Sequence, residues 1–269
     1  MLEKEIMEKA NNTKREVRKK ALQFTAAMIP IAAIGGYFTG KYAYASYTQE
    51  MQQMILAQVG SVQALALSSM VQSVMYAVIC GFIGYLLAEK TGLMKPIKYE
   101  RESLLKVVII TLICGILFSL DYWTFGKALP EVAATYESEI TIRSFDNWMA
   151  SIFYGGFIEE VLLRLFFMSL VALLLWKIFC RNYGKEEIPE AVYIAANIIS
   201  AMLFAAGHLP TTISMFGGLT LLVVFRCFLL NGGLGMVFGW IYHKYGIQYA
   251  FIGHMGTHII SKIIWLLFV

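Results

Sequence analysis

The division of this chain into long apolar blocks constrains its fold more than any other feature. A hydrocarbon core about 30 Å thick needs roughly 20 consecutive apolar residues in a helix. Of the 269 residues, 58% are hydrophobic and only 15% are charged, against about 25% charged in an ordinary soluble domain. Seven apolar blocks occur, at roughly 21–40, 64–88, 104–125, 148–179, 191–208, 219–242 and 247–269. The sequence therefore predicts an all-α fold, a polytopic transmembrane bundle of about seven membrane helices.

The positions of the basic residues predict the orientation of the bundle. Four segments, 1–20, 89–103, 177–190 and 243–246, hold 15 of the 22 Lys and Arg residues, and the intervening loops hold three. Cytosolic loops of membrane proteins carry this excess of basic residues. We therefore expect residues 1–20 to be a basic cytosolic segment, either solvated or lying near anionic lipid. Residues 21–269 are expected to form a single transmembrane domain whose C-terminus lies outside.

Two blocks do not read as simple straight spans. The block 148–179 would measure about 48 Å as one α-helix, so it must tilt strongly, protrude, or break near Gly155-Gly156. The block 219–242 contains Asn231-Gly232-Gly233, which predicts a kink.

Two adjacent carboxylates, Glu159 and Glu160, fall inside the fourth block. Ionisable side chains within a membrane are costly and by default indicate a functional site. Glu160 shares a helix face with Arg164 four residues later, so the two are expected to form an ion pair that holds helices together. Glu159 points about 100° away from that face. A lone carboxylate in such surroundings can act as a general base.

Three of the four histidines lie in or at the end of the last three blocks. His208 ends the fifth block, where an ordinary interfacial role remains open. His254 and His258 project from one face of the seventh block because they are four residues apart. Counted along straight spans, His208 lies near the outer end of its helix and His254 about 10 Å from the inner end of its own. A shared site requires that one helix breaks or begins deeper than its apolar block.

Three short patterns resemble the motifs of the CAAX protease and bacteriocin-processing (CPBP or Abi) family of intramembrane glutamate proteases. They are Glu159-Glu160-x-x-x-Arg164, Phe204-x-x-x-His208 and His254-x-x-x-His258. The resemblance covers 148–269, with each motif on its own predicted helix. His258 stands where the family usually has Asn, and Leu165 where many members have Gly. The imidazole keeps a hydrogen-bond donor at that position, so the substitution is compatible with activity.

The resemblance implies an intramembrane endopeptidase that uses activated water. Glu159 would be the general base, with His208 either holding the water or sharing its proton. His254 and His258 would donate hydrogen bonds to the oxyanion that forms on the scissile carbonyl. Supporting roles are implied for Glu160, Arg164 and Phe204.

The expected partners are membrane lipids and a peptide or lipidated protein substrate, of the CAAX or the leader and bacteriocin type, and not nucleic acid. No cofactor is expected, although Glu159 with His208, His254 and His258 could supply a tetrahedral zinc set. Two other functions stay open: a transporter coupled to protons or ions, and a non-catalytic immunity or scaffold protein. The resemblance favours the plasma membrane of a prokaryote.

Overall fold

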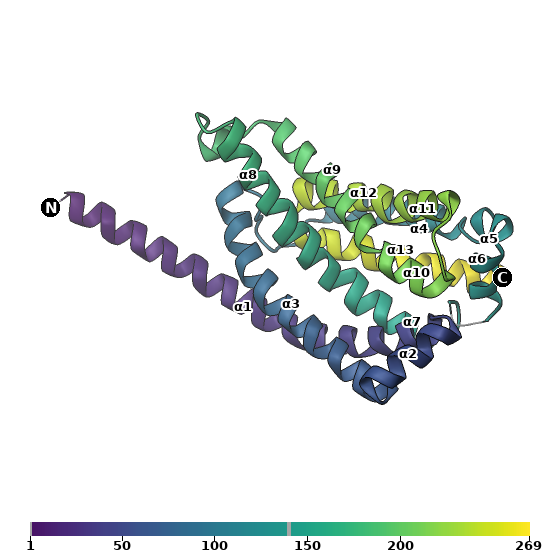
Figure 1. The fold of residues 1–269 in the computed structure, drawn as a ribbon. Helices are drawn as coiled ribbons and strands as arrows, with labels where there is room; N and C mark the ends of the chain where they lie inside the picture. Colours follow the sequence, from purple (N-terminus) through teal and green to yellow (C-terminus); the bar gives the residue numbers. More distant parts are fainter. Residues whose placement is uncertain (1, 139–140) are drawn as a thin grey trace.

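The computed structural model describes residues 2–138 and 141–269, and within them the chain is helical and has no strand (Figure 1). Seven helical runs in this part are long and apolar enough to cross a membrane: Asn11–Ser46, Val62–Thr91, Arg101–Ser119, Phe145–Phe179, Glu190–Phe216, Leu221–Tyr245 and Ile247–Phe268. Each run corresponds to one predicted apolar block. The predicted polytopic bundle of about seven membrane helices is therefore confirmed.

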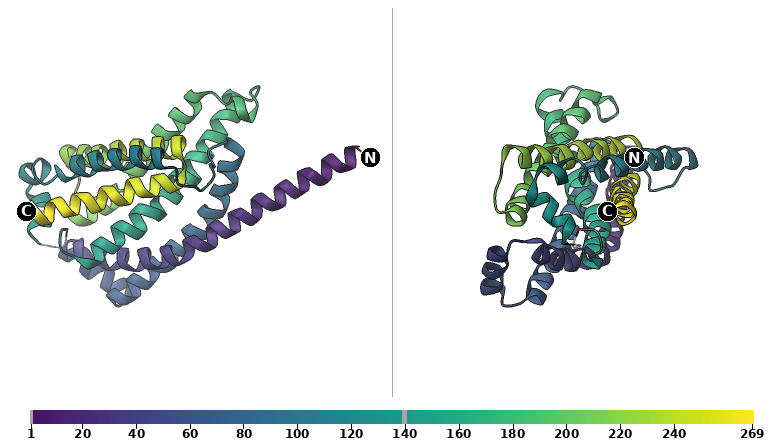
Figure 2. Two further views of the ribbon diagram at one scale, coloured as in Figure 1. Left: turned by 180° about the vertical axis from the view of Figure 1, so that it is seen from behind. Right: turned by 90° about the vertical axis from the view of Figure 1, so that its right-hand side faces the viewer.

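The first helix, α1 (Leu2–Ser46), continues without interruption through the predicted domain boundary at residue 20. Its 45 residues span about 68 Å, roughly twice the thickness of a hydrocarbon core. The N-terminal end projects from the bundle as a straight extension of the first span (Figures 1 and 2). The basic segment is thus helical, and it continues the membrane helix instead of folding back along the bundle.

Small residues allow α1 to pack closely on α3 (Val62–Thr91), to which α2 (Gln49–Val59) connects it. A β-carbon at Gly36 would lie 2.6 Å from the carbonyl oxygen of Ser69. A β-carbon at Gly40 would lie 2.7 Å from the α-carbon of Ala66. Small residues four apart are typical of close helix pairs in membranes, where packing drives association.

The fourth span departs from regular α-helical winding, in the block that the sequence predicted to be too long for one straight span. It consists of α7 (Phe145–Met149), two π-helical stretches, η1 (Ala150–Glu159) and η2 (Val161–Met168), and α8 (Ser169–Phe179). The run does not break at Gly155-Gly156. The π-helical winding places more residues in each turn, which shortens the run relative to an α-helix of the same length. Such winding is rare in proteins overall, and where it occurs it often lies at a functional site.

The fifth and sixth spans also depart from a regular α-helix. The fifth comprises α9 (Glu190–Gly207) and α10 (Leu209–Phe216), with His208 at the junction. The helical run therefore extends past His208, where the apolar block was predicted to end. The sixth contains a π-helical stretch, η4 (Phe228–Gly233), at the predicted kink. It lies between α11 (Leu221–Cys227) and α12 (Leu234–Tyr245).

The last helix, α13 (Ile247–Phe268), is a regular α-helix that packs against α4 (Arg101–Ser119), η1 and α12. Two short helices, α5 (Phe125–Ala128) and α6 (Pro130–Glu137), lie near the C-terminal end of α13 (Figure 1). A small apolar cluster joins them there, and it includes Val132, Tyr136 and Trp265. A short 3-10 helix, η3 (Lys185–Glu187), lies between α8 and α9.

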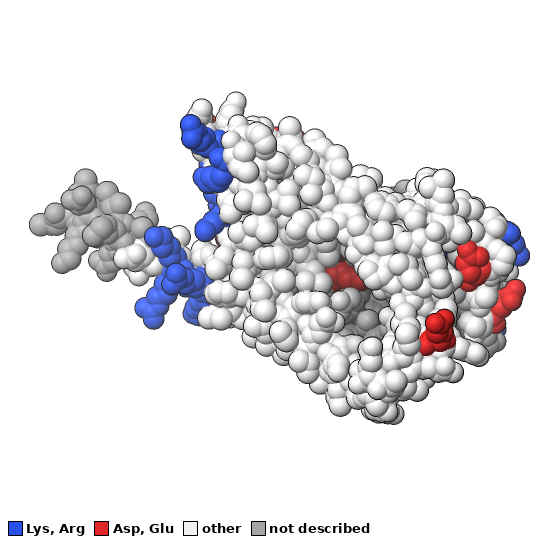
Figure 3. Space-filling view, in the orientation of Figure 1, with Lys and Arg blue, Asp and Glu red and all other residues white. Residues whose placement is uncertain are grey.

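Charged side chains separate along the long axis of the molecule (Figure 3). On the visible face, most Lys and Arg side chains gather at the end from which α1 projects, and most Asp and Glu side chains at the opposite end. The surface between the two ends is almost free of charge, as a lipid-facing surface should be. This separation is the pattern from which the orientation was predicted. The cytosolic position of the N-terminus stays a prediction.

Candidate active site

A cavity of about 450 Å³ opens between the spans that carry the three motifs. Its lining includes Glu159 from η1, His208 from the junction of α9 and α10, and His254 and His258 from α13. The cavity extends past the end of α1 to α6 and α10, toward the acidic end of the molecule. On the face shown in Figure 3, between the two charged ends, a hollow with acidic surface inside it is visible. The structure thus brings the four predicted catalytic residues to one pocket.

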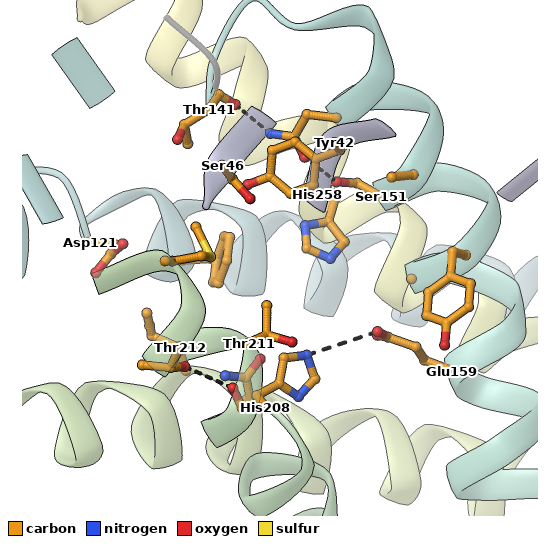
Figure 4. A pocket seen from close by; sticks show the side chains of 18 of the residues that line it. Tyr42, Ser46, Asp121, Thr141, Ser151, Glu159, His208, Thr211, Thr212 and His258 are labelled. Atoms are coloured by element: carbon orange, nitrogen blue, oxygen red, sulfur yellow. Dashed lines mark hydrogen bonds and ion pairs between the residues drawn. The ribbon is translucent and has the colours of Figure 1, made fainter. Parts of the chain in front are cut away.

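The Glu159 carboxylate faces two imidazole rings. Its Oε1 lies 3.9 Å from Nε2 of His208, and its Oε2 lies 3.8 Å from Nε2 of His254. Figure 4 shows Glu159 and His208 pointing toward each other from opposite walls of the pocket. Both separations exceed a direct hydrogen bond. They are of the size that a single water molecule can bridge.

A backbone carbonyl determines which nitrogen of His208 faces Glu159 as an acceptor. The Nδ1 atom of His208 lies 2.8 Å from the carbonyl oxygen of Phe204, one helical turn earlier. Because a carbonyl oxygen can only accept, Nδ1 carries the proton. In the neutral ring Nε2 is then an acceptor, and it is this atom that faces Glu159.

Glu160 points away from the pocket into the protein and contacts two partners. Its Oε1 lies 3.2 Å from Nη1 of Arg164, the predicted ion pair, and 2.8 Å from Nδ1 of His254. The side chains of Glu160 and Arg164 are almost completely buried. Arg164 also donates through Nη2 to the carbonyl oxygen of Gly235 at 2.8 Å. Glu160 therefore joins η1 to α13 and fixes the orientation of the His254 ring.

Aromatic rings enclose the histidines. Phe204 presents its edge to His208 at 4.5 Å between ring centroids, and the guanidinium of Arg164 lies 5.0 Å from the centre of the Phe204 ring. Phe238 stacks on His254 at 4.6 Å. These contacts hold both imidazoles in place and put apolar rings beside them.

His258, which replaces the usual Asn, stacks on His254 with the ring centroids 5.1 Å apart. Its Nδ1 atom is buried and has no hydrogen-bond partner among the described residues. A β-carbon at Gly155 would lie 3.4 Å from its Nε2 atom, so the ring packs close to the backbone of η1. His258 thus keeps polar hydrogen-bonding capacity at the wall of the pocket (Figure 4).

A metal site is not evident in the part of the chain that the structure describes. Within residues 2–138 and 141–269, no three or more His, Cys, Asp or Glu side chains are grouped as metal ligands. One possible ligand atom, Nδ1 of His254, contacts Glu160 at 2.8 Å. The expected independence from cofactors, and the zinc alternative, both stay predictions.

A charged network at the outer part of the pocket was not found from the sequence. Arg226 donates from Nε to Oδ1 of Asp121 at 2.8 Å, and Tyr136 donates to Oδ2 of the same carboxylate at 2.7 Å. Burial, and beside it the Asp121 carboxylate, raises the pKa of Tyr136 above its usual range. A usable signal was present, because an Arg inside a span requires an anionic partner. Asp121 falls near the end of the apolar block 104–125 and lies two residues after the third helical span.

Comparison with known families places these motifs in context. The family model described as Type II CAAX prenyl endopeptidase Rce1-like matches residues 142–260, a segment that contains all three motifs. No curated protein and no solved structure matches the chain. The matched segment begins just before α7 and ends within α13. The CAAX protease resemblance inferred from the motifs is therefore confirmed.

Proposed function

Because the family model described as Type II CAAX prenyl endopeptidase Rce1-like matches residues 142–260, we propose that Glu159 activates the water with which this membrane protein hydrolyses a peptide bond. The family match supports a CAAX-type intramembrane endopeptidase as the general activity. The observation that carries the finer proposal is the position of the Glu159 carboxylate between two imidazole Nε2 atoms, at 3.9 Å and 3.8 Å.

Two hydrogen-bond acceptors, the Glu159 carboxylate and Nε2 of His208, face each other where the nucleophilic water would bind. A water molecule between Glu159 and His208 would donate one O–H to the carboxylate and the other to Nε2 of His208. Its oxygen lone pair would then point toward a carbonyl carbon in the pocket. As the C–O bond forms, Glu159 takes the proton of the water. As the C–N bond breaks, Glu159 passes that proton to the leaving amine.

The opposite wall supplies the donors for the oxyanion. Since Nδ1–H of His254 is directed at Glu160, Nε2 carries a proton only when the ring is an imidazolium. A donor of this kind in a dry site typically contributes about 3 kcal/mol to the stability of the transition state. His258, stacked beside His254, is the candidate for the second donor.

The substrate is proposed to be a peptide or lipidated protein held at the membrane. The family description names a CAAX prenyl endopeptidase, which points to prenylated CAAX proteins, and the motif resemblance adds leader and bacteriocin peptides. Both classes present a flexible chain near an apolar surface, which suits a pocket that opens within a membrane bundle.

The test compares peptide cleavage by wild type, Glu159→Gln and EDTA-treated protein in detergent, read by mass spectrometry. The peptides include prenylated CAAX sequences and leader-type sequences. Glu102→Gln is the matched control, because that carboxylate is exposed on α4 and pairs only with nearby Lys106. We expect cleavage by wild type, by the Glu102 variant and in EDTA, and its loss in Glu159→Gln.

Three other results would count against the proposal in different ways. Loss of cleavage in EDTA, restored by zinc, would replace the metal-free mechanism with a zinc site. Undiminished cleavage by Glu159→Gln would exclude this residue as the general base. Folded wild type that cleaves no peptide would favour the non-catalytic immunity or scaffold role, whereas transport lost in Glu159→Gln would favour the transporter.

A further inference from the structure

The cavity of the candidate active site reaches the acidic end of the bundle. Every span that lines it contributes a residue from its end opposite the basic segments: Ser46, Phe118, Asn147, Phe216, Arg226 and Trp265. The first, third, fifth and seventh spans do so near their C-terminal ends, and the fourth and sixth near their N-terminal ends. Among the residues whose side chains the structure describes, none from the basic segments 11–20, 89–103, 177–190 and 243–246 belongs to the lining. The cavity is therefore one-sided.

The main apolar core closes the cavity toward the basic end. Val161, Leu165 and Met168 follow Glu159 along the fourth span in that direction, and all three are almost completely buried. Further on, the hydroxyl of Tyr242 lies 3.0 Å from that of Ser169 and joins the sixth span to the fourth. The four apolar and aromatic side chains belong to one core cluster. Packing of this density leaves few voids larger than a water molecule, so the core separates Glu159 from the basic end.

Polar side chains line the part of the cavity that leads from the catalytic residues to the acidic end. They carry hydroxyl or amide groups, and they include Ser46, Thr135, Thr141, Asn147, Thr211 and Thr212. Figure 4 shows several of them around the space that Glu159 and His208 face. A hydrocarbon chain here would displace water from these groups without replacing its hydrogen bonds, which is costly. A peptide backbone offers a donor and an acceptor at each residue, so this part of the cavity suits a polar peptide.

We infer that the substrate enters the catalytic pocket from the acidic end, which the charge separation assigns to the outer side of the membrane, and that the substrate is a polar peptide segment exposed there. This inference rests on the proposed peptidase activity for the reaction and on the predicted orientation for the side. It narrows the substrate class. Peptides that have crossed the membrane reach Glu159, whereas lipidated proteins that stay on its cytosolic surface do not.

The first test follows access to the pocket without any turnover. In a variant without the four native cysteines, Thr211→Cys is treated with a charged thiol reagent that does not cross membranes, in intact cells and in inside-out vesicles. Thr211 is exposed and lies in the cavity wall three residues after His208. We expect labelling in intact cells and none in inside-out vesicles. Ser46→Cys, on the wall formed by α1, is a second reporter in case the first variant does not fold.

Leu203→Cys is the matched control for the pocket. It lies on the same helical run as Thr211, is exposed, and is outside the cavity lining. It should stay unlabelled from both sides, because a charged reagent does not enter hydrocarbon. Two exposed positions mark the sides: Lys98→Cys in a basic segment and Glu137→Cys on α6.

Two kinds of labelling result would overturn the inference. Labelling of Thr211→Cys on the side of Lys98→Cys, on both sides or on neither would contradict the entry path. Labelling of Glu137→Cys only in inside-out vesicles would place the acidic end in the cytosol, and would contradict the side to which the substrate is assigned.

Cleavage in sealed vesicles separates this inference from the proposed activity. A charged peptide that wild type cleaves in detergent is added to vesicles of each orientation. We expect cleavage only where the acidic end faces the peptide, and its loss in Glu159→Gln. Cleavage only from the basic end would contradict the entry path and leave the peptidase intact. Outside labelling of the pocket, in a protein that cleaves no peptide even in detergent, would contradict the peptidase alone.

Discussion

Replacement of Arg164 by Met should destabilise the protein more than replacement of Arg164 and Glu160 together. The two side chains are 1% and 0% exposed, and their charged groups lie 3.2 Å apart. Removal of one partner from a buried ion pair leaves an uncompensated charge in a medium that solvates it poorly, whereas removal of both leaves none. The pair should therefore show strong energetic coupling.

The structure sets the expected magnitudes. Arg164→Met leaves the Glu160 carboxylate without its cation, and Glu160→Gln leaves the guanidinium without its anion. Each should lower the free energy of unfolding by about 3–5 kcal/mol. In the double variant the main remaining defect is the carbonyl of Gly235, which loses its donor from Nη2. A buried acceptor left unpaired costs about 1–3 kcal/mol.

The assay is a double-mutant cycle, with unfolding of the purified protein followed by circular dichroism as the denaturing detergent fraction is raised. A parallel cycle on Glu102 and Lys106 is the control, because that pair lies on the exposed face of α4 and should show no measurable coupling. Costs of Glu160→Gln and Arg164→Met that add within about 0.5 kcal/mol would refute the reasoning, because independent sites behave that way.

Three further predictions concern packing, the outer network and topology. Gly156→Ala should destabilise the protein by about 1–3 kcal/mol in thermal unfolding, because a β-carbon there would lie 2.7 Å from that of Met255. Gly207→Ala, whose β-carbon would meet no atom within 4 Å, should leave the stability unchanged. Equal effects of the two substitutions would contradict this account. Because burial and Asp121 raise the pKa of Tyr136, ionisation is easier in the unfolded chain. The wild type should therefore lose stability as the pH rises above about 10, and Tyr136→Phe should lose less; parallel pH profiles would exclude this assignment. Thiol labelling of single cysteines, introduced at either end of a cysteine-free variant, should find the N-terminus cytosolic and the C-terminus outside; labelling of both from one side would contradict an odd number of crossings.

The sequence by itself determined the properties that depend on local spacing along the chain. The apolar blocks identified the seven spans because the thickness of a bilayer fixes how many apolar residues a crossing needs. The spacing of four residues predicted the ion pair between Glu160 and Arg164, since helix geometry alone brings them to one face. The order of the three motifs was enough to predict the resemblance to CAAX proteases, which the family-model match over residues 142–260 confirms.

Only the tertiary structure decided which distant residues meet, because the contacts between helices depend on their winding, depth and rotation. Straight spans put His208 and His254 at different depths, but the fifth helical run continues past His208, and both rings reach Glu159. The ion pair between Arg226 and Asp121 likewise joins two segments 105 residues apart. Lys262 lies within the seventh apolar block, but its place in the cavity wall follows from the packing of α13 on η1. Such contacts join segments far apart in the chain, and no local period encodes them.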